Sequence, residues 1–149
     1  MKIVWSLPVR GETLSSSRGD LVRAQQLSAA LESAGHEVVT LSDAQRPGSS
    51  VTIGAYRKGI RLILPRRLAL ILRDLGRWLH GLRYGAWLAR AAKRSDAQLI
   101  VETQVAFSPS GAVAAKRTGL PLVLDVCSPS AEEELFGVGL PRLARAVQR

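Results

Sequence analysis

The chain has 149 residues, 46% hydrophobic and 22% charged, which is typical of one globular domain with a sizeable core. The single cysteine excludes an internal disulfide. The cysteine and the two isolated histidines do not have the spacing of metal ligands, so we expect no metal site. The formal net charge of +9 indicates an anionic partner, while no apolar run is long enough to span a membrane or to form a signal peptide.

The first forty residues predict a strand, a helix and a second strand. An apolar run rich in β-branched residues over 2–7 is typical of a buried parallel strand. A helix should begin after Ser17 as its N-cap, pack an apolar face that includes Leu27 on the sheet, and end before Gly35. Residues 36–41 predict the next strand, which completes a βαβ unit.

The middle of the chain is strongly basic. Residues 51–56 indicate a short third strand, and residues 65–94 predict one long amphipathic helix. Between Arg46 and Arg94 the only acidic residue is Asp74. A solvated arginine-rich face with no partner is the alternative to an anion-binding surface, and His80 is read as a surface residue of this face. The predicted apolar stripe of the helix consists of Leu68, Ile71, Leu72, Leu75, Leu79, Leu82, Ala86 and Ala89.

The last part of the chain returns to alternating strands and helices. Apolar runs over 97–102 and 120–126 predict two strands, and the small residues over 110–117 predict the helix between them. Short apolar strands that alternate with helices indicate a doubly wound parallel α/β sheet in one domain over residues 1–149.

Candidate binding residues follow the predicted strands, because ligands collect beyond the carboxyl ends of the strands in an open parallel sheet. Neither G-x-G-x-x-G nor a P-loop motif is present, so dinucleotide and P-loop chemistry are not predicted. The loop after the first strand is either an anion-binding site or an ordinary capped helix start without a ligand. Cys127 is either a site residue or a small residue that packs at the end of its strand. The candidates are Arg10, Gly11, Arg18 and Gly19 after the first strand, Glu102 after a later one, and Cys127, Ser128 and Glu133 after the last.

Three stretches together resemble the N-terminal domain of family-four retaining glycosyltransferases, which have two facing Rossmann-like domains. They are RGDLVRAQQLSAALESAGHEVV (18–39), AQLIVETQVAFSPSGAVAAKRTGLPLVLDVCSPSAEEE (97–134) and GLPRLARAVQR (139–149). The chain departs from the family at Cys127, where most members have His and a similar subgroup has Asn, and at Asp125, which replaces Glu.

The resemblance implies the acceptor-binding half of an enzyme that transfers a sugar from a nucleotide-sugar to a saccharide or lipid-linked acceptor. The donor-binding domain of such enzymes would lie beyond Arg149, so we expect no hexosyl transfer by this chain without a separate donor domain as partner. No cofactor is expected apart from the nucleotide-sugar held with that partner. The strand-end candidates would then contact the acceptor or the donor phosphates and line the cleft, and no catalytic residue is assigned.

The resemblance also implies work on cell-envelope polysaccharide, in the cytoplasm at the inner face of the membrane. A basic amphipathic helix suits such an interface. An alternative is a non-catalytic Rossmann-like module that binds a membrane or a protein through this helix. Specific nucleic-acid binding ranks last, because no motif or stacking platform is present. The residues expected at the membrane surface are Arg66, Arg73, Arg77, Arg83, Arg90 and Arg94.

Overall fold

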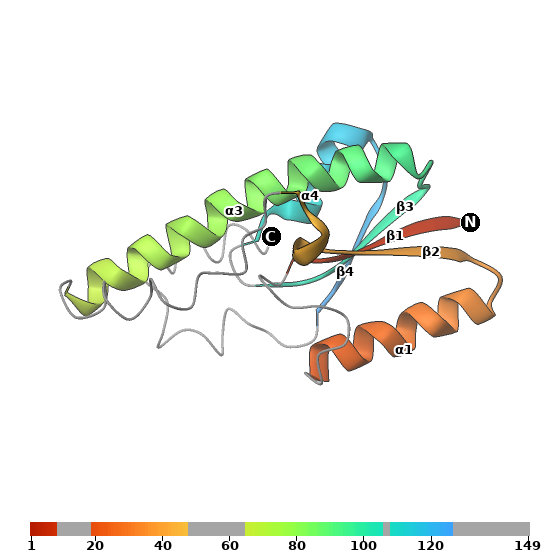
Figure 1. Cartoon of the computed structure of the whole chain (residues 1–149), viewed down its shortest axis with the longest axis horizontal. Helices are drawn as coiled ribbons and strands as arrows, with labels where there is room; N and C mark the ends of the chain where they lie inside the picture. The colour runs from red at the N-terminus through yellow and green to blue at the C-terminus, as the bar shows by residue number, and fades with distance from the viewer. Residues whose placement is uncertain (9–18, 48–64, 106–107, 127–149) are drawn as a thin grey trace.

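The structure is a computed structural model that describes residues 1–8, 19–47, 65–105 and 108–126 (Figure 1). Its centre is a four-stranded sheet with the strand order β2-β1-β3-β4, in which every neighbouring pair is parallel. The elements are β1 (Lys2–Leu7), α1 (Gly19–Ser33), β2 (Glu37–Ser42), the 3-10 turn η1 (Asp43–Gln45), α3 (Arg66–Arg94), β3 (Leu99–Thr103), α4 (Ser110–Thr118) and β4 (Leu122–Asp125).

The parallel α/β sheet predicted from the sequence is confirmed. The first strand has the predicted bounds, and the long helix begins one residue later than predicted. Gly35 follows α1 with a φ of 83°, a left-handed conformation that suits the glycine predicted there. The predicted strand over 51–56 and the predicted N-cap Ser17 lie outside the described residues.

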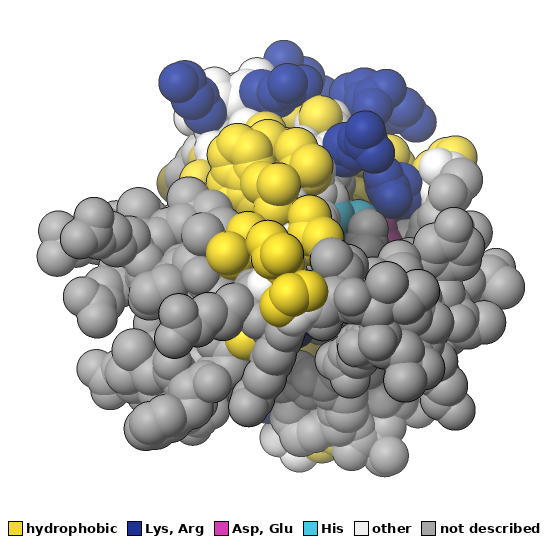
Figure 2. Space-filling view, turned by 90° about the vertical axis from the view of Figure 1, so that its left-hand side faces the viewer, with side chains coloured by type: hydrophobic (Ala, Val, Ile, Leu, Met, Phe, Trp, Pro, Cys, Tyr) yellow, Lys and Arg dark blue, Asp and Glu magenta, His cyan; other side chains and the backbone are white. Residues whose placement is uncertain are grey.

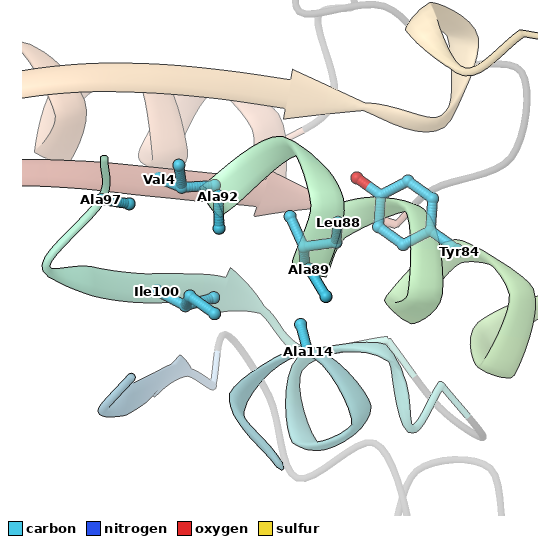
Figure 3. Close-up of a cluster of buried hydrophobic side chains, with 8 residues drawn as sticks. All are labelled: Val4, Tyr84, Leu88, Ala89, Ala92, Ala97, Ile100 and Ala114. Carbon is cyan, nitrogen blue, oxygen red and sulfur yellow. The ribbon is translucent and has the colours of Figure 1, made fainter. Parts of the chain in front are cut away.

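Helices cover the two faces of the sheet unequally. Helices α3 and α4 lie on one face, and α1 lies on the other (Figure 1). Under α1, Leu21 and Ala24 pack against Ile3 and Trp5 of β1 and Val101 of β3. Figure 3 shows the cluster on the opposite face, which consists of Val4, Tyr84, Leu88, Ala89, Ala92, Ala97, Ile100 and Ala114.

Most of the apolar stripe predicted for α3 does not pack on the sheet. The sheet-facing side carries Tyr84, Leu88 and Ala92, which are all fully buried. At 1.5 Å per residue a 29-residue helix is about 43 Å long, whereas a five-residue strand covers only about 17 Å. The N-terminal half of α3 therefore projects past the sheet (Figure 1). Four leucines of the predicted stripe are exposed by 39% to 52%: Leu68, Leu72, Leu75 and Leu79.

Two further sequence predictions are corrected by burial. Leu27 was expected to face the sheet but is 38% exposed, because the side of α1 that packs on the sheet carries Leu21, Ala24 and Leu31. His80 was expected at the surface but is only 8% exposed, because it lies one helical turn before the buried Tyr84 on the same side of α3. The two rings stack with centroids 6.3 Å apart.

Glycines allow α3 and α4 to approach closely. A Cβ atom added at Gly85 would lie 2.6 Å from the carbonyl oxygen of Ser110 and 2.8 Å from Cβ of Val113. One at Gly81 would lie 2.4 Å from Cδ of Pro109. Since real Cβ contacts are not this short, the helix pair needs glycine at both positions.

We expect Gly85→Ala to destabilise the protein, although alanine favours helices. The added methyl meets backbone of α4, and overpacking of this kind costs about 1–3 kcal/mol, more than the gain in helix propensity of about 1 kcal/mol. Gly76→Ala is the matched control, because nothing lies within 4 Å of a Cβ there. Urea unfolding should give a lower midpoint for Gly85→Ala and an unchanged or higher one for Gly76→Ala. Equal midpoints would contradict the close approach.

Candidate functional site at the carboxyl edge of the sheet

The strand order places a topological switch point between β1 and β3. The chain crosses from β1 to β2 on one side of β1, and returns through α3 to β3 on its other side. Ligands of open α/β sheets bind beyond the carboxyl ends of the strands at such a point. Here Ser6 of β1 pairs in register with Glu102 of β3, and both are buried. The candidate site is therefore the carboxyl edge around these two residues.

Glu102 is enclosed by hydrogen-bond donors. Its Oε2 lies 2.6 Å from Oγ of Ser110, which begins α4, and 3.3 Å from Oγ of Ser6. The backbone N–H of Gly111 also donates to this carboxyl group. Burial raises the pKa of Glu102 from 4.5 to about 7, although all three hydrogen bonds favour the ionised form and oppose the shift. The group therefore changes charge near neutral pH.

Ser6 connects Glu102 to Tyr84. The Ser6 Oγ lies 3.4 Å from the phenol oxygen of Tyr84, and the phenol donates to the carbonyl oxygen of Leu41 at 3.1 Å. Burial raises the pKa of Tyr84, and the negative charges of Glu102 and Asp43 add to the shift. The phenol thus stays neutral. Because Ser6 has one hydroxyl proton, it can donate to Tyr84 or to Glu102 but not to both at once.

A second polar cluster follows β2. Asp43 is buried, and its Oδ1 accepts a hydrogen bond from Nε of Arg46 at 3.2 Å. The Nε2 atom of His80 lies 3.3 Å from the same oxygen, without the alignment of a hydrogen bond. Ser42 precedes this turn, and its backbone N–H donates to the side chain of Gln45. This cluster fixes η1 against α3 at the same edge of the sheet.

A third contact joins the end of β4 to α1. Nη2 of Arg23 donates to Oδ1 of Asp125 at 3.0 Å, and Asp125 is 8% exposed whereas the side chain of Arg23 is 53% exposed. On the same face, Nε1 of Trp5 donates to Oγ1 of Thr103 at 3.1 Å. Asp125 thus holds a half-exposed guanidinium group at the carboxyl edge.

The structure describes only two of the site residues predicted at the carboxyl edge. Glu102 ends up under the N-terminus of α4 and is 2% exposed, and Gly19 is the first residue of α1. The remaining predicted residues of the edge lie outside the described residues, namely Arg10, Gly11, Arg18, Cys127, Ser128 and Glu133.

Sequence reasoning missed the partners of Glu102 and the Arg23–Asp125 pair. Ser6 interrupts an otherwise apolar strand, which is a signal that its hydroxyl has a buried partner. Gly81 and Gly85 in the long helix signal a close neighbour. No sequence signal indicates that Ser110 lies on Glu102. No group of three or more His, Cys, Asp and Glu residues in the described part of the chain could hold a metal ion.

We expect Glu102 to make stability fall as the pH rises. Because its folded-state pKa of about 7 lies above its usual 4.5, the folded protein binds more protons between these values. The favourable contribution is fully present below pH 4.5 and is lost as the pH rises through about 7, and it amounts to about 3 kcal/mol at most. Glu102→Gln should abolish this fall in the free energy of unfolding, measured by urea titration across the window.

Glu32→Gln is the control for this experiment. Glu32 is exposed on α1, so its variant should keep the pH dependence of the wild type. Parallel pH profiles for the wild type and Glu102→Gln would show that the buried carboxyl group does not titrate in this range.

The comparisons with known proteins agree with this architecture. The chain matches the family described as Glycosyl transferase 4-like domain over residues 19–149, which is most of its length. No curated protein and no solved structure shows a significant match. With its parallel α/β sheet and this match, the chain belongs to the Glycosyl transferase 4-like domain family.

Proposed function

We propose that this chain is the acceptor-binding half of a glycosyltransferase that moves a sugar from a nucleotide-sugar to a saccharide or lipid-linked acceptor. The observation that carries the proposal is the family match over residues 19–149. Family membership concerns sugar transfer in general. The acceptor role is what the resemblance to the N-terminal domain of such enzymes implies, and the polar edge at the switch point is where a ligand of this sheet would bind.

Arg23 is the described residue best suited to contact an anionic group of the substrates. It projects from the second turn of α1, and Asp125 fixes its guanidinium while leaving about half of the side chain exposed. A guanidinium held in this way recognises phosphate with little loss of side-chain entropy. We include Arg10, Arg18 and Gly19 in the same site, because they lie between β1 and the first turn of α1 in the chain. Cys127, Ser128 and Glu133 follow β4 in the chain, and we include them in the same proposed site.

Glu102 acts in this proposal as a positioning residue rather than a catalytic one. Its carboxyl group is enclosed and holds Ser6 and the N-terminus of α4 in place. Loss of its hydrogen bonds would therefore change the shape of the edge without removing a group that contacts the substrates.

We expect Arg23→Gln to weaken acceptor binding about tenfold, since a hydrogen bond to a charged group contributes about 1.5–3 kcal/mol. Arg10→Ala and Arg18→Ala should act in the same direction. The probes are an array of saccharides and of polyprenyl-diphosphate-linked saccharides, followed by titration calorimetry with any that bind. Arg94→Gln is the control, because Arg94 ends α3 at the opposite edge of the sheet. Equal losses in all four variants would rule out a local site, and an array without any binder would contradict the acceptor role.

We expect the 149 residues alone to transfer no sugar, because an acceptor domain by itself cannot hold the donor in attack geometry. The proposed partner is a donor-binding glycosyltransferase domain. Affinity purification of the chain from its native cell extract should recover such a polypeptide, and the complex should release nucleotide diphosphate in the presence of acceptor. Release of nucleotide diphosphate by the purified chain alone would refute the division into two halves.

A further inference from the structure

The outward side of α3 carries an apolar stripe that nothing in the described chain covers. Leu68, Leu72, Leu75 and Leu79 are spaced by four, three and four residues, so they lie on one side of the helix. Each is between 39% and 52% exposed. Figure 2, which looks onto this end of the molecule, shows hydrophobic side chains gathered in one patch with Lys and Arg side chains next to it.

The same side of α3 becomes basic toward its C-terminus. The spacing of three and four residues continues through Leu82, Ala86, Arg90 and Lys93, so the two cations lie in line with the leucines. Arg90 and Lys93 border a shallow open depression of about 320 Å³ together with Ala86, Ala89 and Arg117 of α4. Three of the five residues that line the depression are thus cations, which favours an anion there.

Negative charge is missing from this side of the helix. Asp74 is the one acidic residue of α3, and it is fully buried and bound to Arg73 at 2.8 Å. None of the ion pairs formed among the described residues involves Arg90, Lys93 or Arg117. The outward side therefore presents only apolar and positive groups.

We propose that the outward side of α3, from Leu68 to Lys93, docks on the surface of an anionic phospholipid bilayer. The leucines enter the boundary between headgroups and acyl chains, and Arg90, Lys93 and Arg117 bind lipid phosphates. The charge pattern favours a bilayer over a protein partner, because cations of one sign beside an apolar stripe match a layer of phosphates above hydrocarbon. In this proposal α3 lies in the plane of the interface with its outward side toward the lipid. No helix of the described residues is long and apolar enough to cross a membrane.

The cations that take part differ from those expected from the sequence. Arg73 is held by buried Asp74, and Arg77 already has an interaction partner, so neither belongs to the docking surface. Arg83 and Arg94 are exposed beside the basic half, and Arg66 lies at the start of α3. Lys93 and Arg117 were not among the residues expected at the membrane surface, and the structure adds them to the docking surface.

Co-sedimentation with phospholipid vesicles tests the apolar half of the surface. The full chain should bind vesicles of phosphatidylcholine mixed with phosphatidylglycerol, and much less those of phosphatidylcholine alone. Leu72→Ser with Leu79→Ser should weaken binding about tenfold or more, because each leucine loses apolar burial. Leu27→Ser is the matched control, since Leu27 is a 38% exposed leucine on α1. Circular dichroism establishes that the variants stay folded.

Single charge changes test the basic half. A cation near an anionic surface contributes about 1 kcal/mol, so Lys93→Ala should weaken vesicle binding about fivefold. Lys116→Ala makes the same change on α4 at an exposed residue outside the depression, and its effect should be smaller. The difference should shrink at high salt.

Three results would overturn the proposal. The first is no binding to anionic vesicles, and the second is equal binding by the leucine variant and its Leu27→Ser control. The third is a wild-type dimer in sedimentation velocity without lipid that the leucine variant converts to monomer, because a second copy would then cover the stripe. Since these readouts use no saccharide, they are independent of the acceptor experiment.

Discussion

Burial of one carboxyl group constrains the helical layer above the centre of the sheet. Glu102 has its hydrogen-bond donors on β1 and at the N-terminus of α4, and a buried carboxyl group without such donors would cost several kcal/mol. The donors from α4 require its first turn to lie directly on the sheet. Gly111 permits this, because a Cβ there would lie 3.1 Å from Cδ of Glu102. Gly81 and Gly85 of α3 leave room for the same turn of α4, because they place no side chain against Pro109 and Ser110.

The raised pKa of Glu102 connects this packing to the neighbouring polar groups. When the carboxyl group is protonated it can donate to Ser6, and the Ser6 hydroxyl can then donate to Tyr84. When it is ionised it accepts from Ser6, and Tyr84 loses that donor. Tyr84 in turn bonds the backbone of Leu41 near the end of β2. Protonation of Glu102 on β3 therefore reaches β2 through two buried hydroxyl groups, those of Ser6 and Tyr84, and the arrangement of the carboxyl edge depends on the direction of the hydrogen bonds that they form.

The strands of the sheet could be predicted because the residues that indicate each strand lie next to one another in the sequence. The run over 2–7 is mainly apolar, contains the β-branched Ile3 and Val4, and is followed by Pro8, and these features suffice to predict the bounds of β1. The sheet-facing side of α3 was not predicted, because the spacing of large apolar residues marks the leucine stripe and not the side that packs on the sheet. The side that packs on the sheet instead carries Tyr84, Leu88 and Ala92, and Gly85 beside them lets α3 lie close to α4. Large residues at the projecting end meet no strand beneath them.

Contacts of the site are distant in sequence, and this is why they were not predicted. Ser6 and Glu102 are 96 positions apart, and Arg23 and Asp125 are 102 positions apart. Only the strand order brings these residues together, and a strand order cannot be obtained from the spacing of apolar residues. Glu102 itself was predictable, since a carboxylate at the end of an apolar strand is a polar group that must find partners.

The direction of α3 relates its outward side to the candidate site. The helix ends at Arg94, five residues before β3 begins, so it runs opposite to the parallel strands. Its N-terminal half, with the leucine stripe, consequently projects beyond the carboxyl edge where Ser6 and Glu102 lie (Figure 1). Docking through the stripe would keep this edge near the lipid headgroups. Under the proposed function, a saccharide carried on a lipid diphosphate could then reach the edge while its lipid stays in the bilayer.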